Sequence, residues 1–380
     1  MHTKKYVGLV GIAAAMSLVL AGCAGSGGGS ADAGEDGGTA SSTGPWSYEV
    51  TTQAEWDGET TEGEWTSVDD GAGEGISMCA LFPHLKDQTW VAQAEALYDE
   101  AVRTGISYDL YEAGGYENLS TQLSQMEDCI SAGTYDVITL HAVSGDGVCS
   151  TIETALEAGI AVVDAINGTL CDEAVTESPL FHQVAAKYYQ VAKTLGDYIV
   201  EQPGEKKILL LAGPEGVTWS DDSVVAFEDA FAADPENNEI VAAPRGDSDV
   251  ALQLSLATDA LTANPDITDI VSIAAGSSAA LVAVRDAGRE GDINLYSWSP
   301  AEDAYLGVGD GLVQAVASDV VPIQQRMVVN EGIRLVNGEL DYKAIAANGL
   351  IITGDNFDEI PRGDVTTSGP GVKPVFNYAP

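Results

Sequence analysis

From residue 76 onward, short apolar runs alternate with amphipathic stretches, and this alternation constrains the fold more than any other feature. The first apolar runs lie at 76–81, 106–110, 135–140 and 160–165, separated by amphipathic stretches at 88–104, 117–132 and 148–158. A second series has strands at 207–212, 239–243, 269–274 and 294–298, with helices near 182–201, 222–233, 250–263 and 277–288. A strand at 312–317 and a helix at 322–337 follow. Strands separated by helices predict βαβ units and parallel sheets.

Two such series predict an α/β fold with two doubly wound, Rossmann-like lobes joined by a hinge. We expect 76–175 plus 311–340 to form an N-terminal lobe, 176–310 plus 341–362 a C-terminal lobe, and 363–380 a tail. Ligands of open α/β sheets bind at the carboxyl ends of the strands. The loops that follow the strands are therefore the place where a site is expected.

The N-terminus carries an export signal. Residues 1–22 contain Lys4 and Lys5, a short apolar run and the small residues that precede Cys23. The run is too short for a transmembrane helix, and it resembles a bacterial lipobox. We expect Cys23 to be lipidated and the exported protein to be anchored to the cell membrane on its extracytoplasmic face; an ordinary secretory signal is the alternative. Residues 23–44 are rich in Gly, Ser and acidic residues and predict a disordered tether.

The segment 45–75 is acidic and lacks Lys and Arg, yet it contains Trp46, Trp56 and Trp65. Three large apolar side chains need a surface on which to bury their area. That surface is either the protein's own, which we favour, or that of a partner.

Charge narrows the range of partners. The chain has 16 Lys and Arg against 59 Asp and Glu, which gives a formal net charge of -43. Such a protein repels phosphate backbones and anionic head groups, so nucleic acid is not expected as a partner.

Apart from Cys23, the chain has four cysteines, Cys79, Cys129, Cys149 and Cys171, and an exported protein can keep them oxidised. Three pairings are possible. Cys149 and Cys171 follow neighbouring predicted strands at one edge of a sheet, which favours Cys149 with Cys171 and Cys79 with Cys129. No His or Cys cluster has metal-ligand spacing, and we expect neither a metal nor a cofactor.

The loops after the predicted strands combine aromatic rings with polar groups. The candidate ligand-binding residues are Phe82, His84, Asp87, Trp90, Tyr116, Asn118, Asp146 and Asn167 in the first lobe, Trp219, Arg245, Asp247 and Trp298 in the second, and Asp319 after the last strand. Aromatic faces attract cationic and oxidised amines, and they also stack on sugars. A sugar would further need several polar partners for its buried hydroxyls. We therefore expect either a sugar or a small amine or osmolyte as ligand.

Two motifs are more specific. The stretch 79–87, Cys-Ala-Leu-Phe-Pro-His-Leu-Lys-Asp, followed by Trp90, and the stretch 112–116, Glu-Ala-Gly-Gly-Tyr, followed by Asn-Leu, resemble the TorT family of periplasmic binding proteins, within the ribose-type (type I) solute-binding class. The resemblance implies two lobes that close around a small ligand in an aromatic box, to which Trp90, Tyr116 and Trp219 correspond. Phe82 stands where the family commonly has tyrosine.

Enzyme motifs are missing from the sequence: it has no nucleophile elbow, phosphate loop, zinc-protease motif or dinucleotide fingerprint. We therefore expect a binding protein and not an enzyme. Two membrane partners stay open, namely an ABC permease, to which the protein would deliver solute, and a sensor histidine kinase, to which a TorT-like protein would report an N-oxide or related ligand.

Overall fold

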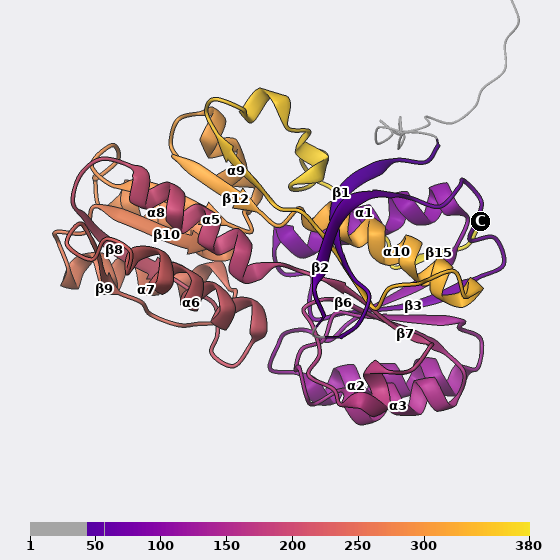
Figure 1. The fold of residues 1–380 in the computed structure, drawn as a ribbon. Helices are drawn as coiled ribbons and strands as arrows, with labels where there is room; N and C mark the ends of the chain where they lie inside the picture. The colour runs from indigo at the N-terminus through magenta and orange to yellow at the C-terminus, as the bar shows by residue number, and fades with distance from the viewer. Residues whose placement is uncertain (1–43, 57) are drawn as a thin grey trace, which may run out of the picture. The chain divides into compact units, whose positions relative to one another are not determined.

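The computed structural model describes residues 44–56 and 58–380, which belong to one compact unit containing two sheets (Figure 1). Both sheets are mostly parallel and carry helices on both faces, as the alternation of strands and helices predicts. The predicted signal peptide, Cys23 and most of the predicted tether lie outside the described residues. Within the described ranges, no helix combines the length and hydropathy needed to cross a membrane.

The first sheet has nine strands in the order β15-β4-β3-β5-β6-β7-β13-β1-β2. Their bounds are β15 Asn377–Tyr378, β4 Ser107–Glu112, β3 Ser77–Phe82, β5 Val137–Leu140, β6 Ala161–Ile166, β7 Phe181–Ala185, β13 Ala344–Ala347, β1 Ser47–Gln53 and β2 Thr60–Thr66. Helices α1 (Gln88–Thr104) and α10 (Val321–Asn337) pack together on one face, while α2 (Leu119–Ala132), α3 (Cys149–Glu157) and α4 (Glu173–Thr176) lie on the other (Figure 1). Strands β3, β5 and β6 are almost fully buried because helices cover both faces.

The second sheet has six strands in the order β14-β12-β11-β10-β8-β9. Their bounds are β14 Leu350–Thr353, β12 Ala315–Ser318, β11 Asn294–Trp298, β10 Asp269–Ile273, β8 Lys206–Leu211 and β9 Asn238–Ala242. Helices α5 (Tyr188–Glu201) and α6 (Thr218–Phe231) share one apolar core with the sheet, and α7 (Val250–Ala263), α8 (Ala274–Asp286) and α9 (Glu302–Gly309) share the other. Two short 3-10 helices, η1 (Phe357–Glu359) and η2 (Arg362–Asp364), follow β14.

The chain passes between the two sheets three times. The crossovers are 186–187 from β7 to α5, 319–320 from β12 to α10, and 348–349 from β13 to β14. They contact one another: the Lys187 ammonium donates to Asn348 Oδ1 at 2.9 Å, and a Cβ on Gly349 would lie 2.8 Å from the Ser318 carbonyl oxygen. Because no side chain fits there, position 349 requires glycine.

Three details differ from the sequence prediction. Phe181–Ala185 forms strand β7 where the sequence predicts the start of a helix, because a short, half-apolar run fits either element. Strand β12 pairs with β11 in the second sheet, so of the stretch 311–340 only α10 packs on the first. Strand β13 and the tail strand β15 pair within the first sheet. Local composition does not reveal which sheet a crossover strand joins.

The segment 45–75 forms a hairpin, β1–β2, on the protein's own first sheet, where β1 pairs antiparallel with β13. Its tryptophans are fixed by polar contacts. The Trp46 Nε1 donates to Glu100 on α1 at 3.2 Å, and the Trp65 Nε1 donates to the fully buried Glu331 on α10 at 2.9 Å. The Trp56 Nε1 donates to the carbonyl of Thr176. Trp46 and Trp65 thus fasten the hairpin to both helices on one face of the sheet, and Trp56 fastens it to α4 on the other.

The hairpin also contacts the crossovers. The Tyr48 hydroxyl donates to the Asn348 carbonyl at 3.2 Å, and the Thr51 hydroxyl donates to Asn348 Oδ1 at 3.1 Å. The Lys187 ammonium donates to the same Thr51 hydroxyl. Strand β1 therefore joins two of the three crossovers through side-chain hydrogen bonds.

Both disulfides lie in the first lobe, and they join the pairs predicted from the sequence. Cys79 on β3 is bonded to Cys129 on α2, and Cys149 at the start of α3 is bonded to Cys171 in the loop after β6. The first bond ties a strand to a covering helix and the second ties a loop to one, so the reduced chain would have more conformational freedom when unfolded.

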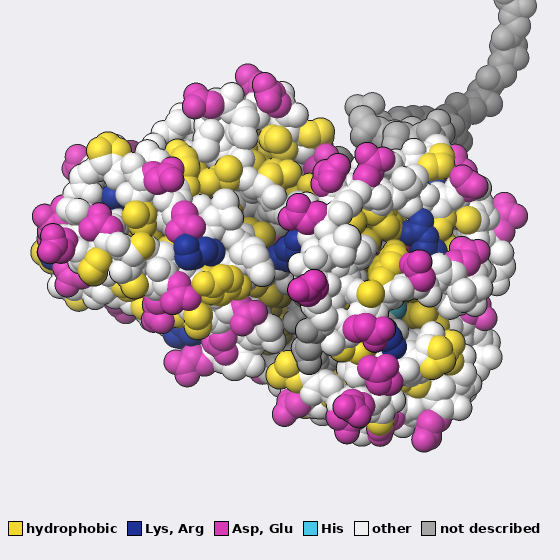
Figure 2. Space-filling view, in the orientation of Figure 1, with side chains coloured by type: hydrophobic (Ala, Val, Ile, Leu, Met, Phe, Trp, Pro, Cys, Tyr) yellow, Lys and Arg dark blue, Asp and Glu magenta, His cyan; other side chains and the backbone are white. Residues whose placement is uncertain are grey.

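Acidic side chains are spread over the whole visible face of the described part, with only a few basic ones between them (Figure 2). Several of the basic side chains are engaged in ion pairs, such as Lys207 with Glu239 at 2.7 Å and Lys193 with Asp197 at 2.6 Å. On this face the excess negative charge is therefore distributed and not gathered in one patch.

Candidate ligand-binding site

A cavity lies where the crossovers meet the carboxyl ends of strands from both sheets. It is lined by Asp87, Thr89, Trp90, Gln93, Tyr116, Ile166, Asn167, Tyr188, Trp219, Ser248, Ile273, Ala274, Trp298, Ser299, Asp319 and Val321. These residues come from the ends of β6, β10 and β11, from the beginnings of α1, α5, α6, α8 and α10, from the loops after β4, β6, β9 and β11, and from the β12–α10 crossover. Its volume is about 50 Å³.

Five aromatic rings form much of the wall. Trp219 stands in the middle of a row, with its ring centroid 5.9 Å from that of Tyr116 and 6.2 Å from that of Trp298. Tyr188 continues the row at 6.3 Å from Trp298, and Trp90 lies on the side of α1. All of these rings except that of Tyr116 belong to residues that are at most 6 % exposed, so their faces are available to the cavity and hardly to solvent.

Two carboxylates face the cavity. Asp87 caps the N-terminus of α1 and accepts the Trp90 amide at 3.1 Å, and burial raises the pKa of its carboxyl. Asp319 is 2 % exposed, and burial raises its pKa to about 6, with the Ser299 hydroxyl acting in the opposite direction. Among the described lining residues there is no Lys or Arg to balance these charges.

Several polar atoms at the cavity have no hydrogen-bond partner among the described residues. They are the Asp319 Oδ1 and Gln93 Oε1 acceptors, the Trp219 indole N–H donor and the Thr89 hydroxyl. A buried polar group without a partner costs roughly 1–3 kcal/mol. A ligand or ordered water that completes these hydrogen bonds would recover that free energy.

Backbone strain is concentrated at the same place. Among the described residues, the non-glycine positions with positive φ are Ile166, Ala274, Ser299 and Val320, with φ of 63°, 24°, 47° and 49°. Three of them line the cavity, and Val320 lies between two residues that do. Positive φ is costly for side chains with a Cβ, most of all for β-branched ones, and such strain is commonly found at functional sites.

Comparisons with known proteins agree with this geometry. The family described as "Periplasmic binding protein domain" matches residues 79–340. The chain belongs to this family. It is 28 % identical over 306 residues to the periplasmic protein TorT of Escherichia coli K12, a match that covers 79 % of this chain and 84 % of TorT.

Two solved structures extend the periplasmic binding protein comparison. An ABC transporter solute-binding protein from Bradyrhizobium sp. BTAi1 with bound Bis-Tris has a TM-score of 0.73 and 27 % identity, covering 87 % of this chain and 98 % of the other. The complex of the TorS sensor domain with TorT, without ligand, has a TM-score of 0.70 and 25 % identity, covering 79 % of this chain and 100 % of the other. The predicted resemblance to TorT and the two-lobed type I fold are confirmed, and the protein is an extracytoplasmic solute-binding protein and not an enzyme.

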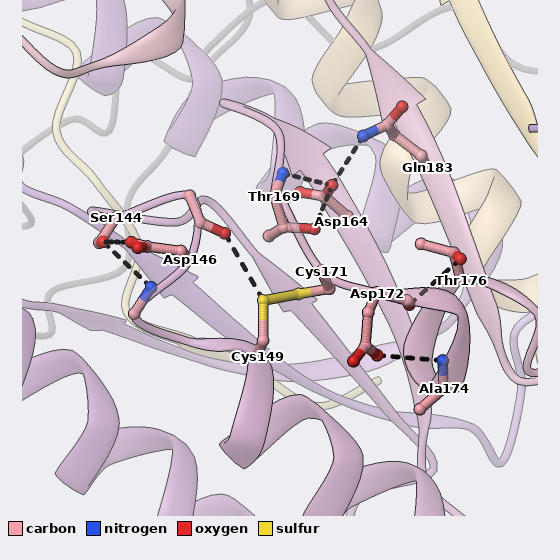
Figure 3. The surroundings of a disulfide bond; sticks show 12 residues. Ser144, Asp146, Cys149, Asp164, Thr169, Cys171, Asp172, Ala174, Thr176 and Gln183 are labelled. Carbon is pink, nitrogen blue, oxygen red and sulfur yellow. Dashed lines mark hydrogen bonds between the residues drawn. A yellow bond between two sulfur atoms is a disulfide. The ribbon is translucent and has the colours of Figure 1, made fainter. Parts of the chain in front are cut away.

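Seven of the residues predicted from the sequence line the cavity of this binding protein, namely Asp87, Trp90, Tyr116, Asn167, Trp219, Trp298 and Asp319. Asn167 is held in place by its side-chain amide, which donates to the Ala142 carbonyl at 2.9 Å and to the Tyr116 hydroxyl at 3.4 Å. The loop that carries it is closed by the Cys149–Cys171 disulfide and by Asp164, whose Oδ2 accepts the Thr169 amide and hydroxyl and the Gln183 amide (Figure 3).

Two other predicted residues lie behind the wall. Phe82 is the last residue of β3 and is fully buried, with its ring 5.4 Å from that of Trp90 and 4.5 Å from that of His141. His84 packs its ring edge-on between Trp90 and Tyr116, at 5.8 and 5.5 Å, and burial lowers its pKa. Both residues support the aromatic wall and do not line the cavity.

The remaining four predicted residues are outside the lining, and three of them, Arg245, Asp146 and Asp247, have hydrogen-bond partners in nearby loops. Arg245 donates to the carbonyls of the loop after β8 and pairs with Asp221 at 2.5 Å. Asp146 accepts the Ser144 hydroxyl near the disulfide (Figure 3), Asn118 occupies the N-cap of α2, and Asp247 accepts the Ser248 amide. Each stands after a strand, but Arg245, Asp146 and Asp247 bind nearby loop groups instead of lining the cavity.

Nine lining residues escape the sequence prediction: Thr89, Gln93, Ile166, Tyr188, Ser248, Ile273, Ala274, Ser299 and Val321. Spacing could have found two of them, since Thr89 precedes Trp90 and Gln93 stands one helical turn after Thr89. Tyr188 is missed because the sequence predicts one helix over 182–201, whereas in the structure β7 and the crossover at 186–187 come before α5, which begins at Tyr188. Ile166 and Ala274 have apolar side chains that do not indicate a binding site in the sequence. They are recognised only from their positive φ angles in the structure.

Proposed function

We propose that this is a lipid-anchored, extracytoplasmic solute-binding protein that closes over one small amine or osmolyte and delivers it to an ABC permease. The observation that carries the proposal is the cavity at the crossovers, with five aromatic rings, two carboxylates and no basic side chain among its described lining residues. Aromatic faces stabilise an organic cation by about 0.5–2 kcal/mol per ring when water is excluded. An oxidised amine or a quaternary osmolyte would use the same faces.

A sugar fits this cavity less well. A hexose carries a hydroxyl on most of its carbons, each of which needs a partner when buried. The buried polar atoms without a partner lie beside aromatic rings, which supports a compact ligand with one or two polar groups.

The ligand class is tested by thermal shift on the mature chain with Cys23 replaced by serine. The amine panel contains Bis-Tris, choline, betaine and trimethylamine N-oxide, and the sugar panel contains pentoses, hexoses and polyols. A ligand that binds only the folded state raises the melting temperature. Stabilisation by the amine panel alone supports the proposal, and stabilisation by sugars alone refutes the ligand class.

The similarity to TorT supports a second candidate, in which the protein presents its ligand state to a membrane sensor kinase. Deletion of the gene separates the two candidates. Delivery predicts that uptake of the stabilising solute is lost, whereas sensing predicts unchanged uptake and loss of a transcriptional response to that solute.

Lipid anchoring is tested independently of the ligand. Wild-type protein should partition with the membrane fraction and into the detergent phase, and Cys23→Ser should release it to the soluble fraction. Release of the wild-type protein would favour an ordinary secretory signal.

A further inference from the structure

We propose that the ligand is a protonated amine that donates an ammonium N–H to Asp319, and that this carboxylate selects against quaternary ammonium ions and N-oxides. This inference rests on the proposed function, because it narrows the amine class that the cavity would hold. It assigns the selectivity to one residue on a crossover, while the aromatic rings supply general affinity.

The first argument is the position of Asp319. It lies on the crossover between β12 and α10, is 2 % exposed and lines the cavity. Its backbone carbonyl accepts the Gln324 side-chain amide, and the next residue, Val320, donates its amide to the Ser318 hydroxyl at 3.0 Å. These contacts fix the backbone on both sides, so the carboxylate is held at the cavity and cannot turn to bulk water without moving the crossover.

The second argument is its missing partner. The Asp319 Oδ1 accepts no hydrogen bond within the described residues, and the nearby Ser299 hydroxyl is the lining group beside the carboxyl. A buried carboxylate without a compensating charge or donor is costly. An ammonium N–H supplies both a positive charge and a donor, and charge-assisted hydrogen bonds are roughly twice as strong as neutral ones.

The third argument is the charge of the surroundings. Asp87 adds a second carboxylate to the lining, and basic side chains in the neighbouring loops have their own partners: Arg245 pairs with Asp221, and Lys86 lies 4.0 Å from Glu117. The cavity is therefore negative, and a cation fits it better than a neutral solute. The buried Trp219 indole N–H has no partner among the described residues, and it could meet a hydroxyl or carbonyl on the same ligand.

These features distinguish three kinds of amine. A protonated amine gives Asp319 both charge and donor. A quaternary ammonium ion brings the charge but has no N–H, so the Oδ1 acceptor stays unsatisfied. An N-oxide brings an oxygen with negative partial charge, which would need a donor and would be repelled by the carboxylates.

Three solutes of similar size make the test direct: trimethylammonium, tetramethylammonium and trimethylamine N-oxide. Isothermal titration of the mature chain at neutral pH should give trimethylammonium the lowest Kd, by tenfold or more over the other two. In Asp319→Asn, trimethylammonium should lose at least tenfold in affinity, and the difference from tetramethylammonium should disappear. Asp259→Asn on the exposed side of α7 is the matched control and should bind as wild type.

The wild-type comparison does not depend on the variant and can overturn the inference by itself. Tighter binding of the N-oxide or of tetramethylammonium would remove Asp319 as the selecting residue while leaving the proposed amine class intact. No binding of trimethylammonium, or an Asp319→Asn protein that binds it unchanged, would also overturn it. Stabilisation by sugars alone in the thermal-shift panels would instead refute the proposed function.

Discussion

Replacing Asp319 by asparagine should stabilise the ligand-free protein at neutral pH, although it removes a group that we assign to binding. Burial raises the pKa of the carboxyl from 3.8 to about 6, which means that the folded state disfavours its charged form. Below the pKa that this carboxyl has in the unfolded chain, it is protonated in both states and does not lower the free energy of unfolding. As the pH rises toward its pKa in the folded protein, that free energy falls. A shift of roughly 2 pKa units corresponds to about 3 kcal/mol in the free energy of unfolding.

Asparagine has nearly the same shape and no charge, so the variant does not incur this loss. Urea denaturation should find Asp319→Asn more stable than wild type by about 3 kcal/mol near pH 7.5, and by about 1 kcal/mol near pH 4.5. The pH dependence separates the charge effect from any change in packing, because packing changes are the same at both pH values. Asp259→Asn should show neither effect.

Equal or lower stability of Asp319→Asn at the higher pH would refute the reasoning. It would mean that the carboxylate is already compensated in the folded protein by groups other than a ligand. A gain that does not change with pH would also contradict it, since the carboxyl would then titrate alike in the folded and unfolded states.

Three further predictions follow from the structure. Trp219→Phe should keep an aromatic face but remove the unpartnered indole N–H, weakening binding of a hydroxyl-bearing amine severalfold by titration while the Tm changes little. Gly349→Ala should lower the free energy of unfolding by about 1–3 kcal/mol, because its Cβ would meet atoms at 2.6 and 2.8 Å, whereas Gly354→Ala, with open space around it, should be near neutral; equal losses would refute the steric argument. Removing the Cys149–Cys171 disulfide with paired serines should cost about 3 kcal/mol in urea denaturation, and a loss below 1 kcal/mol would mean that other contacts fix the loop.

The sequence predicts the architecture well because hydrophobic periodicity reports burial directly. Strands such as β3 and β6 are buried on both faces and read as continuous apolar runs, and the helix predicted at 88–104 is observed as α1. Pairing of the crossover strands could not be predicted in the same way. The four residues of β12 would be buried in either sheet, so their apolar character does not indicate which one they join. The strand with which β12 pairs depends on contacts with residues far away in the chain.

The site was partly predictable for a related reason. A loop after a strand lies at the correct edge of the sheet, so Trp90, Trp219 and Trp298 are found by position. Whether a polar side chain then points to the cavity depends on whether other hydrogen-bond partners lie within its reach. Arg245 has carbonyls and Asp221 within reach and turns away, while Asp319 has few alternatives on its crossover.

The N-terminal hairpin has a mechanical consequence. A load applied to the chain at Gly44 would pass along β1, whose ladder with β13 begins at Val50–Ala347, next to Asn348, and ends at Gln53–Ala344. The Tyr48 and Thr51 hydrogen bonds transmit it to that crossover, while Trp46 and Trp65 transmit it to α1 and α10. The first sheet and the crossover at Asn348 would thus share the load. The second sheet would not carry it and could move relative to the first.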